Sequence, residues 1–418
     1  MRRLQASVIG WVIGALLLGI AAGSQAQDSQ ATSPVFTLRT SVKGGGLLFA
    51  PRGPESASVS NAGQELLGRV RLDSRLQIDA HLDVTAAYEQ RVHRLSTARS
   101  SAVLAMLPTE ATPAYRVAPL DWRLASSGTS AWYHEIDRAA AHVRAGRADV
   151  TVGRQAIGWG RGVVFGAVDL FAPFSPLEID REWRRGIDAA HAEVRLSEHT
   201  SADAVVAAGR RWDESLTAGR VRGYRGNIDI EGVGGRRARD WFGGATTSAA
   251  IGGAEVHGEV AVFRLPGPLP FDNTRTVTKA VVGSSYRLPV GSGVLVYAEY
   301  HYSGFGLRHA SDVAAALTQP AYAARLLRGD MQVLSRHATA VLASYDVSPL
   351  VALAASWVGN PLDGSGVVTP NVTVTPGDRV SVVTAAYLPY GTVLRDGRLG
   401  SMFGASPVSV FLQLRVYF

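Results

Sequence analysis

The chain has 418 residues, a formal net charge of +7 and a sequence pI near 9.8. Apolar residues make up 46% of it, but beyond the first 26 residues no run of apolar residues is long enough for a helical membrane span. It contains no cysteine, which excludes disulfides and thiolate metal sites as supports of the fold. A secreted sandwich, an enzyme or a membrane barrel all remain compatible with these totals, so the patterning along the chain must decide.

The first 26 residues have the three parts of a secretory signal peptide. Arg2 and Arg3 supply positive charge, an apolar run covers 8–22, and Ser24-Gln25-Ala26 places small residues where a signal peptidase cleaves. Because the run is shorter than the ~20 residues of a membrane span, cleavage after Ala26 is favoured over an uncleaved anchor. We expect residues 27–418 to be exported through the inner membrane and to form one domain.

Stretches with an apolar–polar period of two follow, as expected of strands with one face in lipid or in a core. They cover 68–75, 77–89, 188–196, 254–262, 276–288, 292–303 and 408–418. Strands of about 11–13 residues exceed the ~5–6 typical of globular sheets and suit tilted membrane strands. The polar faces carry many charges, which a water-filled lumen tolerates. The predicted lumen wall comprises Arg69, Arg71, Asp73, Asp79, His81, Asp83, Arg154, His191, Glu193, Arg195, Glu255, Glu259, Lys279, Glu299 and Arg415.

The connections between these stretches alternate in length. Short links near 74–76, 145–146, 197–201, 252–253, 289–292 and 348–349 alternate with long ones near 44–64, 93–130, 158–184, 213–239, 266–275, 305–331 and 390–406. Short turns on one side and long loops on the other are typical of bacterial outer-membrane barrels. With both chain ends on the short-turn side, the number of strands must be even.

Fifteen stretches are clear strands, and 366–375 supplies a sixteenth despite Pro370. The fold class predicted is therefore all-β: a transmembrane antiparallel β-barrel of about 16 strands, with 14 or 18 as alternatives. The last strand ends on Phe418. A terminal aromatic residue on an alternating strand resembles the signal that the outer-membrane assembly machinery recognises, so Phe418 is the predicted assembly signal.

The most distinctive connection is 158–184, which together with the adjoining Arg185 carries four positive charges balanced by four negative ones. Opposed charges inside a pore narrow the passage and select solutes by charge and hydrogen bonding. We predict that this loop folds into the lumen; the alternative is a structured external loop held by salt bridges. The predicted constriction residues are Arg161, Asp169, Glu178, Asp180, Arg181, Glu182, Arg184 and Arg185.

Several short motifs give a resemblance to a known group of proteins. Gly153-Arg154-Gln155, Trp159-Gly160 and Arg185-Gly186-Ile187-Asp188, with 297–304 and 357–360, resemble segments of Gram-negative porin-like barrels related to alginate-export proteins. The resemblance covers 150–418. It implies passive or facilitated passage of a small hydrophilic solute or an exported polymer such as a polysaccharide. The acids on the predicted lumen faces argue against a channel dedicated to polyanions.

Other classes of function have little support in the sequence. A His-Glu-x-x-His metal helix and a phosphate-binding loop are both missing, so neither an enzyme nor a cofactor is expected. The arginines are dispersed, which disfavours nucleic acid and suggests contacts with outer-membrane lipids and the phosphates of lipopolysaccharide. The rival to a channel is a non-conducting barrel that binds or helps assemble surface polysaccharide, and conductance would distinguish the two.

Overall fold

Antiparallel strands make up most of the described chain, which is residues 34–53, 62–96 and 113–418 of a computed structural model. The predicted signal peptide, 1–26, lies outside the described residues. Residues Val35–Phe418 form one compact unit. Its strands are β1 (Val35–Ala50), β2 (Gly63–Gln77), β3 (Leu82–Leu95), β4 (Asp121–Ser127), β5 (Ser130–Ala145), β6 (Ala148–Gln155), β7 (Ile187–Arg195), β8 (Thr200–Ala207), β9 (Leu216–Arg225), β10 (Ile228–Arg237), β11 (Asp240–Ile251), β12 (Ala254–Arg264), β13 (Thr276–Leu288), β14 (Val294–Ser303), β15 (His337–Ser348), β16 (Val351–Asn360), β17 (Ser365–Gly377), β18 (Val380–Tyr390), β19 (Leu394–Arg395), β20 (Arg398–Leu399) and β21 (Val408–Tyr417).

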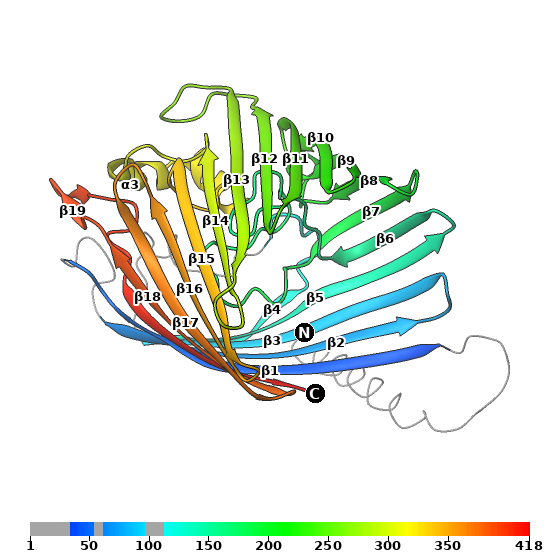
Figure 1. The fold of residues 1–418 in the computed structure, drawn as a ribbon, viewed down its shortest axis with the longest axis horizontal. Coiled ribbons are helices and arrows are strands. Elements are labelled where there is room, and N and C mark those ends of the chain that lie inside the picture. The colour runs from blue at the N-terminus through cyan, green and yellow to red at the C-terminus, as the bar shows by residue number, and fades with distance from the viewer. Residues whose placement is uncertain (1–33, 54–61, 97–112) are drawn as a thin grey trace. The chain divides into compact units, whose positions relative to one another are not determined.

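Pairing between neighbouring strands closes the sheet into a barrel (Figure 1). The first strand, β1, pairs on one edge with β2 and on the other with the last strand, β21. Within the described residues the sheet has 19 strands, of which all but β4 form the ring, giving 18. The prediction of an antiparallel all-β barrel is confirmed; the number of ring strands is not the favoured 16 but 18, which was one of the two alternatives.

The two additional strands are β9 and β10, which occupy most of the interval 213–239 that the sequence predicted as a long loop. They contain five glycines and few large apolar residues, and glycine weakens the strand pattern because it offers no side chain to pack. Their inward faces pair charges instead, with Arg220 and Glu231 at 3.4 Å. Full pairing with β8 and β11 stabilises a hairpin whose own sequence has little strand propensity.

The link between β2 and β3 lies further along the chain than predicted, at 78–81 rather than near 74–76. There the Asp79 carboxylate accepts the backbone N–H groups of His81 and Leu82, at 2.6 and 2.8 Å, as in an Asx turn. Asp79 and His81 therefore lie in a turn and not on a wall strand, which corrects their predicted placement.

Pro370 is accommodated in β17, so the predicted strand 366–375 is confirmed. It lies opposite Ala355 of β16, while the ladder to β18 resumes only at Asn371. Proline has no N–H to donate, and the ladder is interrupted where that donor is missing. The short strand β4 fills another gap: it covers the part of the β5 edge, Ser130–Glu135, that β6 leaves unpaired.

Long and short connections gather at opposite ends of the barrel. We call the end with 113–120, 156–186, 208–215, 265–275, 304–336 and 391–407 the loop end, and the opposite end, where both Val35 and Phe418 lie, the turn end. Two short helices, α3 (Val313–Leu317) and α4 (Pro320–Leu327), belong to 304–336. No helix of the described residues is long and apolar enough to cross a membrane.

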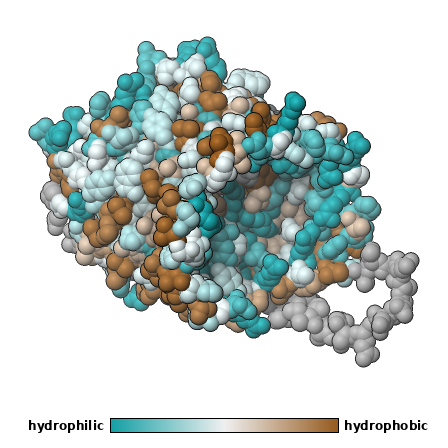
Figure 2. Space-filling model, in the orientation of Figure 1, coloured by the Kyte–Doolittle hydropathy of each residue, from teal (hydrophilic) through white to brown (hydrophobic). Residues whose placement is uncertain are grey.

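The two faces of the wall differ in chemistry. On β21, Val410, Leu412 and Leu414 point outward and are exposed, while Ser409 and Gln413 alternate with them and are buried inside. Figure 2 shows apolar patches on the outer surface and a hollow lined largely with hydrophilic residues. An apolar outside with a charged inside is the pattern of a barrel whose outer wall contacts lipid.

Candidate functional site: the barrel interior

The connection 156–186, which we call the inward loop, lies inside the barrel. It contacts inward-facing residues on strands all around the wall: Lys43 on β1, Glu135 on β5, Glu231 on β10, Glu299 on β14 and Tyr387 on β18. An external loop could not contact all of these strands at once. The structure therefore places this loop inside the barrel.

Two wall carboxylates hold the backbone of the inward loop. Glu259 on β12 accepts the N–H groups of Arg161, Gly162 and Ala167, the last two at 2.7 Å. Glu299 on β14 accepts those of Val164 and Phe165, both at 3.0 Å, and also that of Val163. Consecutive backbone N–H groups that converge on a carboxylate form an anion-binding nest.

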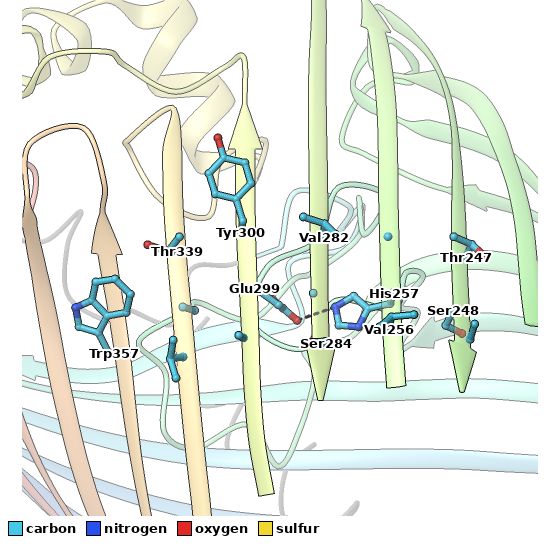
Figure 3. A pocket seen from close by; sticks show the side chains of 16 residues that line it. Thr247, Ser248, Val256, His257, Val282, Ser284, Glu299, Tyr300, Thr339 and Trp357 are labelled. Atoms are coloured by element: carbon cyan, nitrogen blue, oxygen red, sulfur yellow. Dashed lines mark hydrogen bonds and ion pairs between the residues drawn. The ribbon is translucent and has the colours of Figure 1, made fainter. Parts of the chain in front are cut away.

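Glu259 and Glu299 consequently have a different role from the one predicted. The alternation placed both on a water-lined wall, but each is only 4% exposed beneath the loop. Glu299 also contacts His257 at 3.2 Å, as Figure 3 shows. Both face the interior as expected, yet they anchor the loop and do not contact the lumen water.

The opposite side of the loop is bound to the first and last strands. Asp180 lies 2.8 Å from the amino group of Lys43 on β1 and 3.6 Å from the guanidinium of Arg415 on β21. Glu182 lies 2.7 Å from Lys43 and accepts the hydroxyl of Tyr417 at 2.9 Å. The loop therefore bridges the two strands whose pairing closes the barrel.

The remaining predicted constriction residues lie inside the barrel, and all but Glu178 contact oppositely charged groups or backbone carbonyls. Arg161 pairs with Glu231 at 2.9 Å, Arg185 with Glu135 at 2.7 Å, and Arg184 with Asp169. Arg181 donates to the carbonyls of Val163, Ser175, Pro176 and Glu178 within the loop. The arginines mainly fix the shape of the loop. Because they are paired, they add little uncompensated positive charge to the lumen.

A cluster that the sequence did not single out lies under the loop on β5. Glu135 and Asp137 are essentially fully buried and share five arginines from different parts of the chain. Alternation along 132–144 would have placed both acids on one face, but their partners come from elsewhere and no local pattern predicts them. The arginines are Arg71, Arg91, Arg116, Arg138 and Arg185.

A second segment, 304–336, is anchored to the wall by another such cluster. Asp330 is bound by Arg237 at 2.7 Å and Arg325 at 3.1 Å, and Arg325 also binds Asp240 at 2.9 Å. Burial alone would raise the pKa of Asp330, but the arginines around it, Arg237 foremost, hold that pKa well below its usual range. This carboxylate stays ionised, which keeps the segment docked.

Between the two inward segments and the β2–β3–β5 wall lies a cavity of about 180 Å³. One side is apolar, with Phe171, Phe174 and Trp183, and the other carries charged side chains. The charged residues around it are Arg69, Glu89, Asp137, Glu178, Asp180, Arg185 and Arg328.

The other residues predicted on the lumen wall lie mostly on inward faces, where they form ion pairs. Arg154 is an exception, because in the alternation along β6 it follows Val150 and Val152, which are exposed on the outward face; its predicted place on the lumen wall is wrong. Its side chain is covered by the backbone of Ala118 and pairs with Asp188 at 2.6 Å. Arg195 is exposed near the turn end, and Lys279 is 1% exposed. The pairs are Arg71 with Asp73, Arg75 with Asp83, His191 with Asp203, Arg222 with Glu193, and His257 with Glu255.

No protein-family model matches the chain, and no curated protein sequence matches it. Solved structures do match. OccAB1 of Acinetobacter baumannii has a TM-score of 0.55 at 10% identity, over 94% of this chain and 99% of that one. OccK11 (OpdR) of Pseudomonas aeruginosa has a TM-score of 0.53 at 10% identity, over 92% and 96%. OccK9 (OpdG) of the same organism has 0.52 at 9%, over 92% and 98%. The chain therefore has the fold of Gram-negative porin-like β-barrels.

Proposed function

We propose that this protein is an outer-membrane channel for small hydrophilic solutes, in which the inward loop forms the constriction. The observation that supports it best is the docking of residues 156–186 against charged groups all around the interior. A loop fixed in this way narrows the lumen while charged and hydrogen-bonding groups remain beside the passage. The porin-like fold and the apolar outer wall support placement in the outer membrane.

The size of the solute follows from the same geometry. The inward loop and the segment 304–336 both occupy the lumen, and the cavity between them holds about 180 Å³. A polymer would need a continuous wide bore, so nothing here favours the exported polymer that the sequence resemblance implied. Small polar molecules, whose charged groups can exchange hydrogen bonds with the paired arginines and acids, fit this interior better.

Conductance through a planar bilayer tests the proposal. The folded protein should give stepwise currents, and the double variant Glu259→Gln/Glu299→Gln should give larger and noisier steps. Both substitutions remove an acceptor from buried backbone N–H groups of the loop, at about 1–3 kcal/mol for each group left unsatisfied. The loop would then leave its docked position for part of the time and the passage would widen.

A control is Glu193→Gln, which makes the same kind of substitution on an inward face but at a residue that pairs with Arg222, away from the loop. Its currents should equal those of the unmodified protein. If the folded barrel carries no current at any voltage, the channel proposal fails and a binding role replaces it. If the double variant conducts like the control, the barrel is a channel but the loop does not form its constriction.

A further inference from the structure

A cleft of about 920 Å³ opens at the loop end, between the start of 304–336, the β16–β17 turn and the connection 391–407. Its lining has four arginines, Arg308, Arg336, Arg395 and Arg398, against two acids, Asp363 and Asp396. Asp363 is already engaged, because its oxygens accept the N–H groups of Ser365 and Met402. Arg308 and Arg336 both pair with Asp272. Within the described residues, Arg395 and Arg398 are therefore the two arginines of the cleft that have no salt bridge.

The hairpin β19–β20 places two of these arginines side by side. Its turn residues, Asp396 and Gly397, both have positive φ, 52° and 73°, as the type I′ turn of a two-residue hairpin requires. Arg395 is thereby paired directly across from Arg398. Within the described residues neither forms a salt bridge, and like charges directly opposite destabilise a hairpin. An anion between the two guanidinium groups would remove that repulsion, and guanidinium binds phosphate in a bidentate manner.

The cleft lies at the depth where a lipid headgroup would be. Tyr302 and His337 in its lining belong to the outward faces of β14 and β15, with their rings 5.2 Å apart. Tyr300 follows on the same face of β14, and Trp357 on β16 donates to the hydroxyl of Tyr390 at 2.7 Å. A belt of outward aromatic residues marks the membrane–water interface of such barrels.

An apolar groove continues from the cleft down the same wall. It measures about 720 Å³ and runs over the outward faces of β11–β16, as Figure 3 shows. Small residues such as Gly258, Ser284 and Ala298 form its floor, and Val282, Tyr300 and Trp357 border it. Tyr300 in the groove and Tyr302 in the cleft are consecutive outward residues of β14, so the two depressions adjoin.

We propose that this face binds a phosphorylated glycolipid of the outer leaflet, with its phosphate in the arginine cleft and an acyl chain in the groove. The charged cleft near the loop end fits the phosphorylated headgroup of such a lipid. The apolar groove below it on the same wall fits an acyl chain. The inference rests on the proposed outer-membrane location and is independent of conduction.

Native mass spectrometry of the folded, detergent-purified protein with diphosphorylated lipid A as the probe tests this site. Arg395→Gln/Arg398→Gln should weaken binding about tenfold or more, because charge-assisted hydrogen bonds to the phosphate are lost. Ala298→Phe, which fills the groove, should weaken it as well. The matched control Arg210→Gln/Arg236→Gln removes two exposed arginines elsewhere at the loop end and should stay within about twofold.

Three outcomes would overturn the proposal. Equal weakening by the control pair would mean general attraction between a basic surface and an anion. Inorganic phosphate that binds the cleft as tightly as lipid A would indicate a site for free phosphate. Unchanged binding in both the cleft variant and the groove variant would exclude the site. Because all variants should conduct like the unmodified protein, failure here is distinguishable from failure of the channel proposal.

Discussion

Glu178 differs from the other acidic residues around the lumen cavity. Glu89, Asp137 and Asp180 each form a salt bridge with an arginine or lysine, whereas Glu178 forms none within the described residues and accepts the N–H of Ser175 at 3.1 Å. Burial raises the pKa of Glu178 above its ordinary value. Its protonation therefore changes the net charge beside the passage without breaking an ion pair.

Acidification should shift the selectivity of the channel toward anions. A carboxyl group with a raised pKa takes up its proton at a higher pH than an ordinary glutamate near ~4.3, so the shift should begin above that range. The reversal potential in a salt gradient, followed from about pH 7 to pH 5, measures it. Glu178→Gln should be shifted toward anions already at neutral pH and should lose this pH dependence.

Glu193→Gln serves as control, because Glu193 lies on an inward face away from the cavity and pairs with Arg222. It should retain the full pH dependence. A Glu178→Gln channel that titrates like the unmodified one would show that another group controls the charge of the passage.

From the sequence, the charged residues that face the interior could be predicted well, but the ion pairs and hydrogen bonds that they form could not. Alternation placed Arg71, Glu259 and Glu299 on inward faces correctly. It could not show that Glu259 lies under the backbone of a loop 92 residues away, or that Arg116 binds Asp137. Such contacts depend on how loops and strands distant in the sequence come together, and a local pattern has no information about that.

Strand β10 provides a matched pair of glycines at the scale of a single element. A Cβ at Gly235 would lie 2.2 Å from the carbonyl oxygen of Thr217 on β9, whereas one at Gly232 would meet nothing within 4 Å. Glycine at 235 therefore allows the two strands to approach closely. Glycine weakens the strand pattern in the sequence of this hairpin, and at position 235 it is also required for the packing of the hairpin.

Gly235→Ala should destabilise the barrel by about 1–3 kcal/mol, because the backbone of β9 must move to avoid the added carbon. Gly232→Ala should change stability by no more than about 0.5 kcal/mol. The temperature at which the folded band is lost in a heat-modifiability gel compares the two. Equal stability of both variants would show that β9 and β10 are not packed as described here.

The sequence predicted 16 of the 18 ring strands with boundaries close to those observed. Those it found have long apolar outward faces, the feature that lipid requires of every such strand. In β9 and β10 five glycines interrupt a short outward face that has Val221, Ile228 and Ile230, so that signal is weaker, and β4 is an exposed addition on the edge of β5. These three strands form because they pair with neighbouring strands, and their local sequence has too little strand propensity to predict them.

Closure of the whole molecule depends on the last strand. The backbone N–H of Phe418 donates to Thr40 on β1 at 2.8 Å, and its carbonyl accepts from Thr40 at 3.2 Å. Phe418 as a whole residue is 68% exposed at the turn end. The backbone of Phe418 thus completes the seam, and the ring is accessible to another protein.

Phe418→Ala should separate these two roles. The backbone hydrogen bonds remain, so refolding into detergent micelles in vitro should be nearly as efficient as for the unmodified chain. In cells, the amount of folded barrel in the outer membrane should fall several-fold if the assembly machinery recognises the ring. Phe411→Ala on the same strand, with a side chain that faces inward, is the control. Equal amounts of all three proteins in cells would exclude Phe418 as the assembly signal.

The contacts of Asp180 and Glu182 with both end strands have a consequence for how the protein matures. Asp180 contacts Lys43 near the start of the chain and Arg415 near its end, so its native position exists only once those two strands are neighbours. Docking of the loop and closure of the seam therefore stabilise each other. A barrel whose first and last strands have not yet paired lacks the contacts that hold this side of the loop. Under the proposed function, the constriction therefore reaches its final shape only when the last strand pairs with the first.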